Sequence, residues 1–395
     1  MTPNRMRVAI LTTDNREFQR SYEETEPRFG PAVEALLEGL FALSALEVHV
    51  IACTQRPMHA PEKLADNTWF HLLHVPKIGW LRTGYQGCVR ALRRKLRKLN
   101  PQIVHGQGTE RECALAAAFS GFPNVVTVHG NMGAVARAVG AHLGSYHWCA
   151  ARIERLALRR TNGVFCNSEY TEMLVRRFNR RTWLVPNAIR LPFFARPLPG
   201  PHTAGNPVLV NIGVVAPYKR QSEVLALARE LHQAGHRFEL QFVGPADSRS
   251  AYARSFLEQI RTAEKNGYAH YLGMLKVDAL IERLDQASAL IHVPTEEAFG
   301  LVVAEALARN LKLFGAQVGG IPDIAEGVEG AELFPLGDEV RMRHSIERWL
   351  DSGCARPTEA ALTMRSRYDT EIIAARHFEI YESLIRSRDG AIVQG

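Results

Sequence analysis

The alternation of short apolar runs with longer helical stretches is the feature that most constrains the fold of this chain. Runs rich in β-branched residues, such as RVAILTT at 7–13 and NVVTVH at 124–129, are separated by segments whose apolar residues recur at helical spacing. Several runs are apolar at successive positions, which is typical of strands covered on both faces. The pattern therefore predicts an α/β protein with parallel sheets.

The expected strands form two series along the chain. The first comprises RVAILTT, EVHVIAC, QIVHG, NVVTVH, GVFCNS and TWLVP, and the second comprises PVLVNIG, FELQFVG, ALIHV and LKLFG. Helices are expected at 32–43, 223–235, 277–288 and 369–387, where the apolar residues repeat every three to four positions.

The length of 395 residues exceeds what one ordinary core accommodates, so we expect two domains. The stretch 191–207 holds five prolines and two glycines and should continue neither a helix nor a central strand. We therefore expect an N-terminal domain over 1–190, a linker over 191–206 and a second domain over 207–365.

Composition excludes several classes of protein. Hydrophobic residues make up 46% of the chain and charged residues 23%, and no apolar stretch approaches the length of a membrane span. The first apolar run is too short for a signal peptide, so we expect a cytoplasmic protein. The six cysteines form no CxxC pair, which favours reduced, buried thiols over disulfides or zinc.

Positive charge is concentrated in the first half of the chain. Residues 1–190 hold 26 Lys and Arg against 15 Asp and Glu, and the basic residues gather at 90–100, 152–160 and 176–181. Three explanations stay open: solvated helix surface, peripheral contact with anionic lipid at the inner membrane surface, or nucleic acid. No zinc-finger or RNP-type pattern supports nucleic acid, so we expect none as a partner.

The segment EAFGLVVAEALA at 297–308 is the most specific motif. It follows an expected strand directly, and a glycine at the start of a helix leaves backbone N–H groups open to a phosphate. Glu305 should lie about two turns into this helix, where it could bond a ribose diol. The competing interpretation is that Glu297 caps the helix and Glu305 lies on the surface.

With further segments in the same order, the chain resembles the retaining glycosyltransferases of family 4. The segments are VVTVHG (125–130), CNSEYT (166–171), VPNAI (185–189), NIGVVAPYKR (211–220) and GGIPDI (319–324). The resemblance implies a GT-B architecture, in which two Rossmann-like domains with parallel sheets face each other across a cleft and a C-terminal helix (366–395) crosses back to the first domain. It implies transfer of a hexose, with retention, from a UDP- or GDP-sugar to a glycan, lipid-linked or small-molecule acceptor, as in polysaccharide biosynthesis.

The resemblance also assigns roles to individual residues. Glu297 would hold hydroxyls of the donor sugar, Glu305 the ribose, and Lys219 the leaving phosphate. His129 would be the active-site histidine near the sugar and the acceptor. The diphosphate would be bound by the backbone of four consecutive residues, Phe299, Gly300, Leu301 and Val302.

The chain departs from the family pattern around the expected phosphate site. Gly213 is present, but Val214 stands where the family usually has arginine, and Arg220 replaces the glycine after the lysine, where it could supply the lost charge. At the N-terminal loop a single glycine, Gly30, remains of a pair that the family often has. Gly30 could permit close approach of the donor phosphate or the acceptor, or it could simply form the turn before a helix. Two recurrent asparagines are expected in supporting roles or as turn and cap residues: Asn167 and Asn187.

No cofactor and no metal are expected, because the sequence has no Asp-x-Asp motif for a diphosphate-bound cation. Three alternatives remain: a nucleotide-sugar epimerase, a phosphorylase-type enzyme with pyridoxal, and a nucleotide-sugar-binding protein without transferase activity. A dehydrogenase is disfavoured because TTDNRE, not GxGxxG, follows the first strand.

Overall fold

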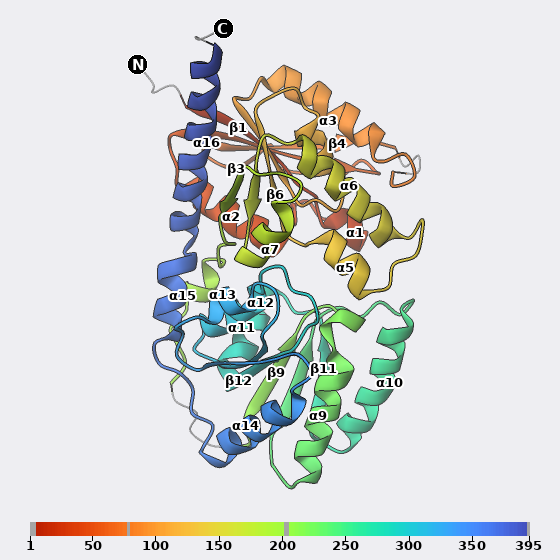
Figure 1. The fold of residues 1–395 in the computed structure, drawn as a ribbon, viewed down its shortest axis with the longest axis vertical. Helices are drawn as coiled ribbons and strands as arrows, with labels where there is room; N and C mark the ends of the chain where they lie inside the picture. Colours follow the sequence, from red (N-terminus) through yellow and green to blue (C-terminus); the bar gives the residue numbers. More distant parts are fainter. Residues whose placement is uncertain (1–4, 77–79, 201–204, 393–395) are drawn as a thin grey trace. The chain divides into compact units, whose positions relative to one another are not determined.

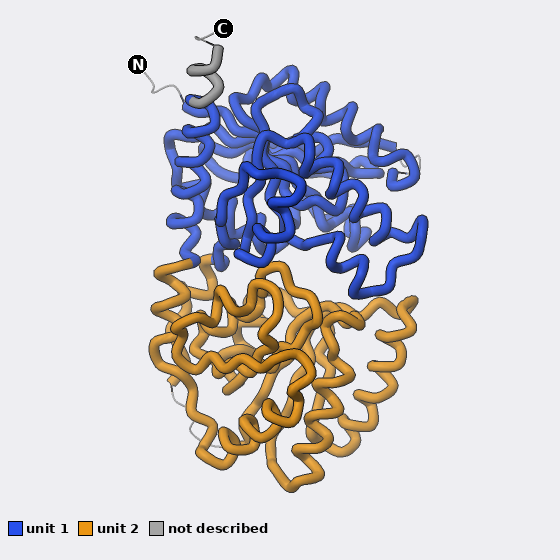
Figure 2. Tube along the Cα trace, viewed as in Figure 1, with its two compact units in different colours: residues 1–190, 368–395 blue, residues 191–367 orange. Residues whose placement is uncertain are grey.

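The computed structural model describes residues 5–76, 80–200 and 205–392, with side chains through Arg386. The chain divides into two compact units (Figure 2). Unit 1 comprises residues 1–190 and 368–395, and unit 2 comprises residues 191–367. Each unit is built on its own sheet, and each is described by itself below.

Unit 1 contains an eight-stranded sheet in which every neighbouring pair is parallel except β3 and β4. The strand order is β3 (Lys63–Ala65), β4 (Thr68–His74), β2 (Leu46–Thr54), β1 (Met6–Leu11), β5 (Ile103–Gln107), β6 (Asn124–Val128), β7 (Val164–Cys166) and β8 (Thr182–Leu184).

Alternate residues of the central strands face opposite layers of helices. Val8 and Ile10 of β1 pack in one core with α2 (Pro31–Phe41) and α16 (Thr370–Ile392). Ala9 and Leu11 pack in another core with α3 (Gln86–Leu99) and α4 (Glu112–Ala118). Both faces of the sheet are therefore covered, which explains why these strands are apolar at successive positions. The other helices are α1 (Arg16–Gln19), α5 (Met132–Ala138), α6 (Tyr146–Arg160) and α7 (Glu169–Val175).

The C-terminal helix α16 lies along unit 1 and packs against α2 (Figure 1). Gly39 permits this packing, because a Cβ there would lie 2.1 Å from the Thr370 carbonyl oxygen and 2.8 Å from the Ala374 Cβ. Tyr381 of α16 is fully buried and hydrogen-bonds His105 of β5. Among the described residues, α16 included, no helix combines the length and apolarity needed to cross a bilayer.

Unit 2 contains a six-stranded sheet that is parallel throughout. Its order is β11 (Ala269–Gly273), β10 (Glu239–Val243), β9 (Val208–Ile212), β12 (Ala289–His292), β13 (Lys312–Ala316) and β14 (Ala331–Phe334). Its helices are α8 (Pro192–Ala195), α9 (Gln221–Gln233), α10 (Ala251–Lys265), α11 (Val277–Gln286), α12 (Leu301–Leu307), α13 (Ile321–Ala325), α14 (Glu339–Asp351) and α15 (Ala360–Tyr368), together with the 3₁₀ helix η1 (Pro217–Lys219).

Two expectations about local structure need correction. The proline-rich stretch was expected to exclude helix, but it begins with α8, whose Pro192 stands at the first helical position, where a missing N–H costs nothing. Four strands were not expected: β3, β4, β11 and β14. Their common feature is partial exposure, which breaks the continuous apolar runs that mark the central strands.

We expect Gly39→Val to lower the free energy of unfolding by about 1–3 kcal/mol, the usual cost of overpacking, because the new side chain collides with the Thr370 backbone. Chemical denaturation followed by circular dichroism would measure the loss. Gly30→Ala, at the start of the same helix with open space around its Cβ, is the matched control. An equal loss in both variants would contradict the packing account.

Candidate active site

The candidate site of unit 2 lies where the order of its sheet reverses. The chain leaves β9 toward β10 on one side, whereas β12 pairs with β9 on the other side. In open parallel sheets, ligands bind at the carboxyl ends of the strands beside such a reversal. The loops that follow these two strands, 213–220 and 293–300, carry most of the predicted donor-site residues.

Lys219, Glu297 and His292 form a compact triad at this position. The Lys219 Nζ lies 2.6 Å from the Glu297 Oε2, and the His292 Nε2 lies 3.1 Å from the same oxygen. Only 15% of the Lys219 and Glu297 side chains is exposed, and His292 is buried. The fold therefore gathers an ammonium, a carboxylate and an imidazole around one oxygen atom.

The charges of the triad depend on one another. Burial alone would raise the pKa of Glu297, but the Lys219 ammonium and the His292 hydrogen bond lower it to about 2. Burial works against the Lys219 ammonium, yet the carboxylate raises its pKa above the ordinary value. Burial lowers the pKa of His292 despite the opposing effect of Glu297. At neutral pH the pair is charged, and a neutral His292 donates its Nε2–H to the carboxylate.

Backbone contacts hold the Glu297 loop in place. The Thr295 N–H donates to the Tyr218 carbonyl at 2.8 Å, which ties this loop to the residue preceding Lys219. The Glu297 carbonyl accepts from the Gly320 N–H at 3.1 Å. Gly319 has a φ of +61°, and a Cβ there would lie 1.8 Å from the Glu297 carbonyl oxygen, so only glycine fits. The GGIPDI segment thus positions the Glu297 backbone.

The predicted glycine at the start of a helix is confirmed. Gly300 caps α12 with a φ of +103°, and its carbonyl accepts from the N–H groups of Val303 and Ala304. The N–H groups of Leu301 and Val302 have no acceptor within the helix, as at any helix start. Phe299, just before the cap, is buried with 3% exposed.

Glu305 is buried, with 3% of its surface exposed, so the interpretation as a surface residue is wrong. Glu297 lies ahead of the Gly300 cap and does not cap α12 itself. The depth of Glu305 also needs correction: it is the fifth residue of α12, just over one turn into the helix, not two.

The expected phosphate arginine is absent from the loop after β9, as the sequence shows. Gly213 follows β9 with a φ of +153°, and Val214 is 39% exposed. Arg220 is already engaged by two carboxylates: Glu339, at 2.7 Å, and Glu223, at 3.3 Å. Its guanidinium is held against these acids and so does not stand open at the place of the missing arginine.

Unit 1 holds His129 at the carboxyl end of β6. Its Nε2 lies 2.8 Å from the Gln107 Oε1 at the end of the neighbouring strand β5. Burial lowers the pKa of His129 to about 4, against a contact with the Asn187 side chain. The imidazole is therefore neutral at pH 7, and with Oε1 as acceptor its Nε2 carries the proton.

Two further predicted residues lie in unit 1. Asn167 follows β7 and is 1% exposed, and neither its amide oxygen nor its amide nitrogen has a hydrogen-bond partner. Such a buried amide calls for an explanation, and an absent ligand is one. Gly30 caps α2 with a φ of −72° and open space around its Cβ, so its backbone does not require glycine. Its donor-binding role stays a prediction.

A cavity of about 450 Å³ opens at the carboxyl ends of the strands of unit 1. Arg111 lies in its wall, 8% exposed, with its guanidinium over the rings of Phe18 at 4.4 Å and Trp80 at 5.7 Å. Tyr85 and Tyr146 complete the aromatic lining. The cavity combines flat aromatic walls with two arginines, the buried Arg111 and the exposed Arg82, and such a mixture of apolar walls and a few polar groups is common in ligand pockets.

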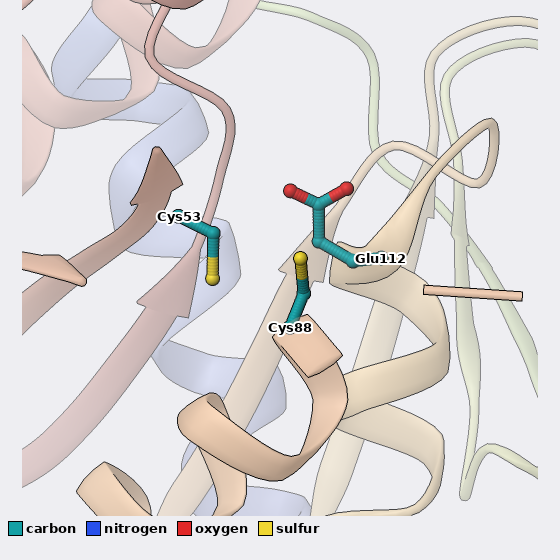
Figure 3. A group of neighbouring side chains, drawn as sticks. All are labelled: Cys53, Cys88 and Glu112. Atoms are coloured by element: carbon teal, nitrogen blue, oxygen red, sulfur yellow. The ribbon is translucent and has the colours of Figure 1, made fainter. Parts of the chain in front are cut away.

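Two cysteines that are far apart in the sequence lie close together in the structure. Cys53 and Cys88 do not stand alone: together with Glu112 they place their ligand atoms within 4.8 Å of one another (Figure 3). The thiol contact with Cys88, together with burial, raises the pKa of Cys53 well above its ordinary value. The Arg111 guanidinium already lies 3.4 Å from the Glu112 carboxylate. The three groups are also one ligand short of the four that a tetrahedral metal site needs. All six cysteines are free, and Cys149 is only partly buried.

The residues that line the Arg111 cavity were not singled out in the sequence, and neither were three further polar residues: His292, Gln221 and Gln107. His292 and Gln107 end buried strands, so polarity at a strand terminus is the signal that could have identified them. Gln221, 2% exposed, donates its amide to the Val214 carbonyl at 2.9 Å and fixes the loop after β9. The sequence gives no comparable signal for Gln221, because a glutamine is an ordinary first residue of a helix.

Two family models together match most of the chain. Residues 33–192 match the model described as Glycosyltransferase Family 4, and residues 199–367 match the model described as Glycosyl transferases group 1. A relative in Streptomyces kanamyceticus, 2-deoxystreptamine glucosyltransferase, is 25% identical over 287 residues, covering 69% of this chain and 73% of the relative.

Solved structures share the fold. Sucrose-phosphate synthase from Thermosynechococcus elongatus superposes with a TM-score of 0.75 at 17% identity, over 97% of this chain and 100% of the other. Anabaena HepE in complex with UDP-glucose gives a TM-score of 0.69 at 15% identity, over 96% and 100% of the two chains.

We expect Glu297→Gln to lower the free energy of unfolding by about 1.5–3 kcal/mol, because the buried Lys219 ammonium loses its charged partner. The double variant Lys219→Met/Glu297→Gln should cost less than the sum of the two single variants, since neither charge is then left alone. Glu339→Gln, in a more exposed pair, is the control and should cost about 0–1 kcal/mol. Additive losses in urea denaturation would show that the pair is not coupled.

Proposed function

The chain belongs to the glycosyltransferases with the GT-B fold, and from this we propose that it transfers a hexose from a UDP- or GDP-sugar to an acceptor with retention of anomeric configuration. Unit 2 binds the donor in this proposal. The observation that carries it is the Lys219–Glu297–His292 triad beside the start of α12, at the reversal of a parallel sheet.

The proposed chemistry is assisted departure of the nucleoside diphosphate. As the bond to the sugar breaks, negative charge develops on the leaving phosphate, and a preoriented Lys219 ammonium stabilises it. An ammonium has three N–H donors, so the bond to Glu297 fixes its orientation and leaves donors for the phosphate. The backbone of Phe299 through Val302 bonds the diphosphate, and Glu297 and Glu305 bond hydroxyls of the sugar and the ribose.

We propose that this leaving-group stabilisation needs no metal ion, because the lysine supplies the positive charge that a cation would otherwise bring. Retention follows in the proposal if the acceptor attacks from the face that the diphosphate leaves. Neither Glu297, which is committed to Lys219, nor Glu305, which is assigned to the ribose, acts as a nucleophile.

The acceptor is assigned to unit 1. The cavity around Arg111 offers aromatic faces to a ring and the guanidinium groups of Arg111 and Arg82 to polar groups, and its volume of about 450 Å³ suits a molecule of sugar size. His129 is neutral, so in the proposal it forms hydrogen bonds with hydroxyl groups of the sugar or the acceptor. The candidate acceptors are a glycan, a lipid-linked sugar and a small molecule such as 2-deoxystreptamine, which the name of the Streptomyces relative contains.

A second candidate function is nucleotide-sugar binding without transfer. It is favoured by Val214 together with the engagement of Arg220 by Glu339 and Glu223, because the site then has a single side-chain cation, Lys219, among the residues considered for the phosphate. An assay of nucleoside diphosphate release distinguishes the two functions. A transferase releases the diphosphate from the donor only when an acceptor is present, whereas a binding protein releases none. An epimerase would convert the donor with no acceptor present.

If Glu305 holds the ribose, Glu305→Ala should weaken binding of the nucleoside diphosphate by about 1.5–3 kcal/mol, the range for a hydrogen bond to a charged group. A thermal-shift screen of UDP and GDP would first identify the base, and calorimetry would then measure the affinity. Unfolding of the unliganded variant is the control, because Glu305 is buried. Unchanged affinity would show that another group binds the ribose.

Lys219→Ala should lower turnover at saturating donor by about a hundredfold to a thousandfold, the scale for removal of one preorganised transition-state donor. Arg220→Ala, the matched control, should affect turnover far less, because Arg220 is bound to Glu339. Both would be assayed with EDTA present, where the wild type should stay fully active. Near-normal turnover of Lys219→Ala, or loss of wild-type activity that manganese restores, would contradict the proposed leaving-group chemistry.

A further inference from the structure

A second cavity in unit 1, of about 250 Å³, lies between α5, α6 and the end of α7. Its lining includes four arginines from three different elements: Arg137 on α5, Arg155 and Arg159 on α6, and Arg177 just after α7. Their side chains are exposed, so the positive charge is accessible from solvent. Parts of the basic clusters at 152–160 and 176–181 therefore converge on a hollow and do not simply cover the outside of separate helices.

One aromatic ring gathers three of these guanidinium groups. Those of Arg155, Arg159 and Arg177 lie 5.8, 5.6 and 4.9 Å from the centre of the Phe178 ring. Contact with a ring face stabilises a cation, and it also fixes where the guanidinium lies. Phe178 therefore holds three like charges close together, which is unfavourable unless an anion joins them.

The cavity lacks a compensating negative charge. Within the described part of the chain, none of the four guanidinium groups forms an ion pair with a carboxylate. The acid in the lining is Glu154, which accepts hydrogen bonds from Thr109 and from the Met132 and Gly133 N–H groups. Burial raises the pKa of Glu154, so it favours the neutral form more than an exposed glutamate does. Its bonds cap α5 and leave the arginines uncompensated.

We propose that this cavity binds a phosphate or diphosphate group, either free or esterified in a lipid headgroup. Guanidinium forks match phosphate oxygens with paired hydrogen bonds, and the volume accommodates one or two phosphate groups. The proposed donor site is in unit 2, whereas every residue that lines this cavity is in unit 1. The inference therefore goes beyond the proposed function and does not depend on it.

The test compares the full-length wild type with two double variants. Arg155→Gln/Arg177→Gln removes two of the converging charges, and Arg94→Gln/Arg97→Gln removes the same charge from α3, away from the cavity. Calorimetric titration with inorganic diphosphate should give affinity at least about tenfold weaker in the first variant, since each charge-assisted contact contributes strongly. The control should match the wild type. Any binding in unit 2 is common to all three proteins, so the titrations are fitted with two sites and only the site that the first variant weakens is assigned to the cavity.

Hydrogen exchange locates the site. Diphosphate should slow exchange over residues 132–178 in the wild type and in the control, but not in Arg155→Gln/Arg177→Gln. Thermal unfolding of the three proteins without ligand checks that the glutamines leave the fold intact, as expected for exposed positions.

Vesicles distinguish the two sources of the phosphate. If the group belongs to a lipid, the wild type should co-sediment with phosphatidylglycerol vesicles but not with phosphatidylcholine, the Arg155→Gln/Arg177→Gln variant should lose this binding, and diphosphate should compete. If the group is free, diphosphate binds and vesicles do not. The proposal is overturned if neither probe binds the wild type, or if both double variants weaken binding equally. A failure to bind UDP would instead count against the proposed function.

Discussion

The ion pair between Lys219 and Glu297 is the interaction on which the candidate donor site depends. It joins the loops that follow β9 and β12, and each charge is stable in a mostly buried place only because the other is there. His292 donates a hydrogen bond to the same carboxylate. Gly319, which has no Cβ, leaves room for the Glu297 backbone to pass close to it. The pair is thus at once a structural bond between two loops and the source of an oriented ammonium.

This coupling bears on the missing arginine of the proposed donor site. Val214 brings no charge, and Arg220 is held by Glu339 and Glu223, so in the proposal the oriented lysine is the main side-chain cation for a phosphate. The cavity beside Phe178 in unit 1 has the opposite character, because guanidinium groups gather around that ring without carboxylate partners. Positive charge is therefore arranged differently at the two places, paired with carboxylates at the candidate donor site and unpaired around Phe178.

Much of the fold was predictable because the central strands are covered on both faces. Val8 and Ile10 face one layer of helices while Ala9 and Leu11 face the other, so these positions all had to be apolar. The half-exposed strands β4 and β11 lack that pattern and were missed. Helix α8 was missed because proline normally argues against helix, although it is well suited to the first position.

The sequence by itself determined the parallel α/β class, the glycine at the start of α12 and the absence of an arginine at Val214, because each depends on local residue types. Only the tertiary structure decided which side chains meet. His292 and Glu297 come within 3.1 Å through a loop anchored by Tyr218 and Gly320, and Arg220 meets a carboxylate 119 residues away. Such contacts depend on where strand order reverses and on which polar groups burial forces together, and neither is encoded in spacing along the chain.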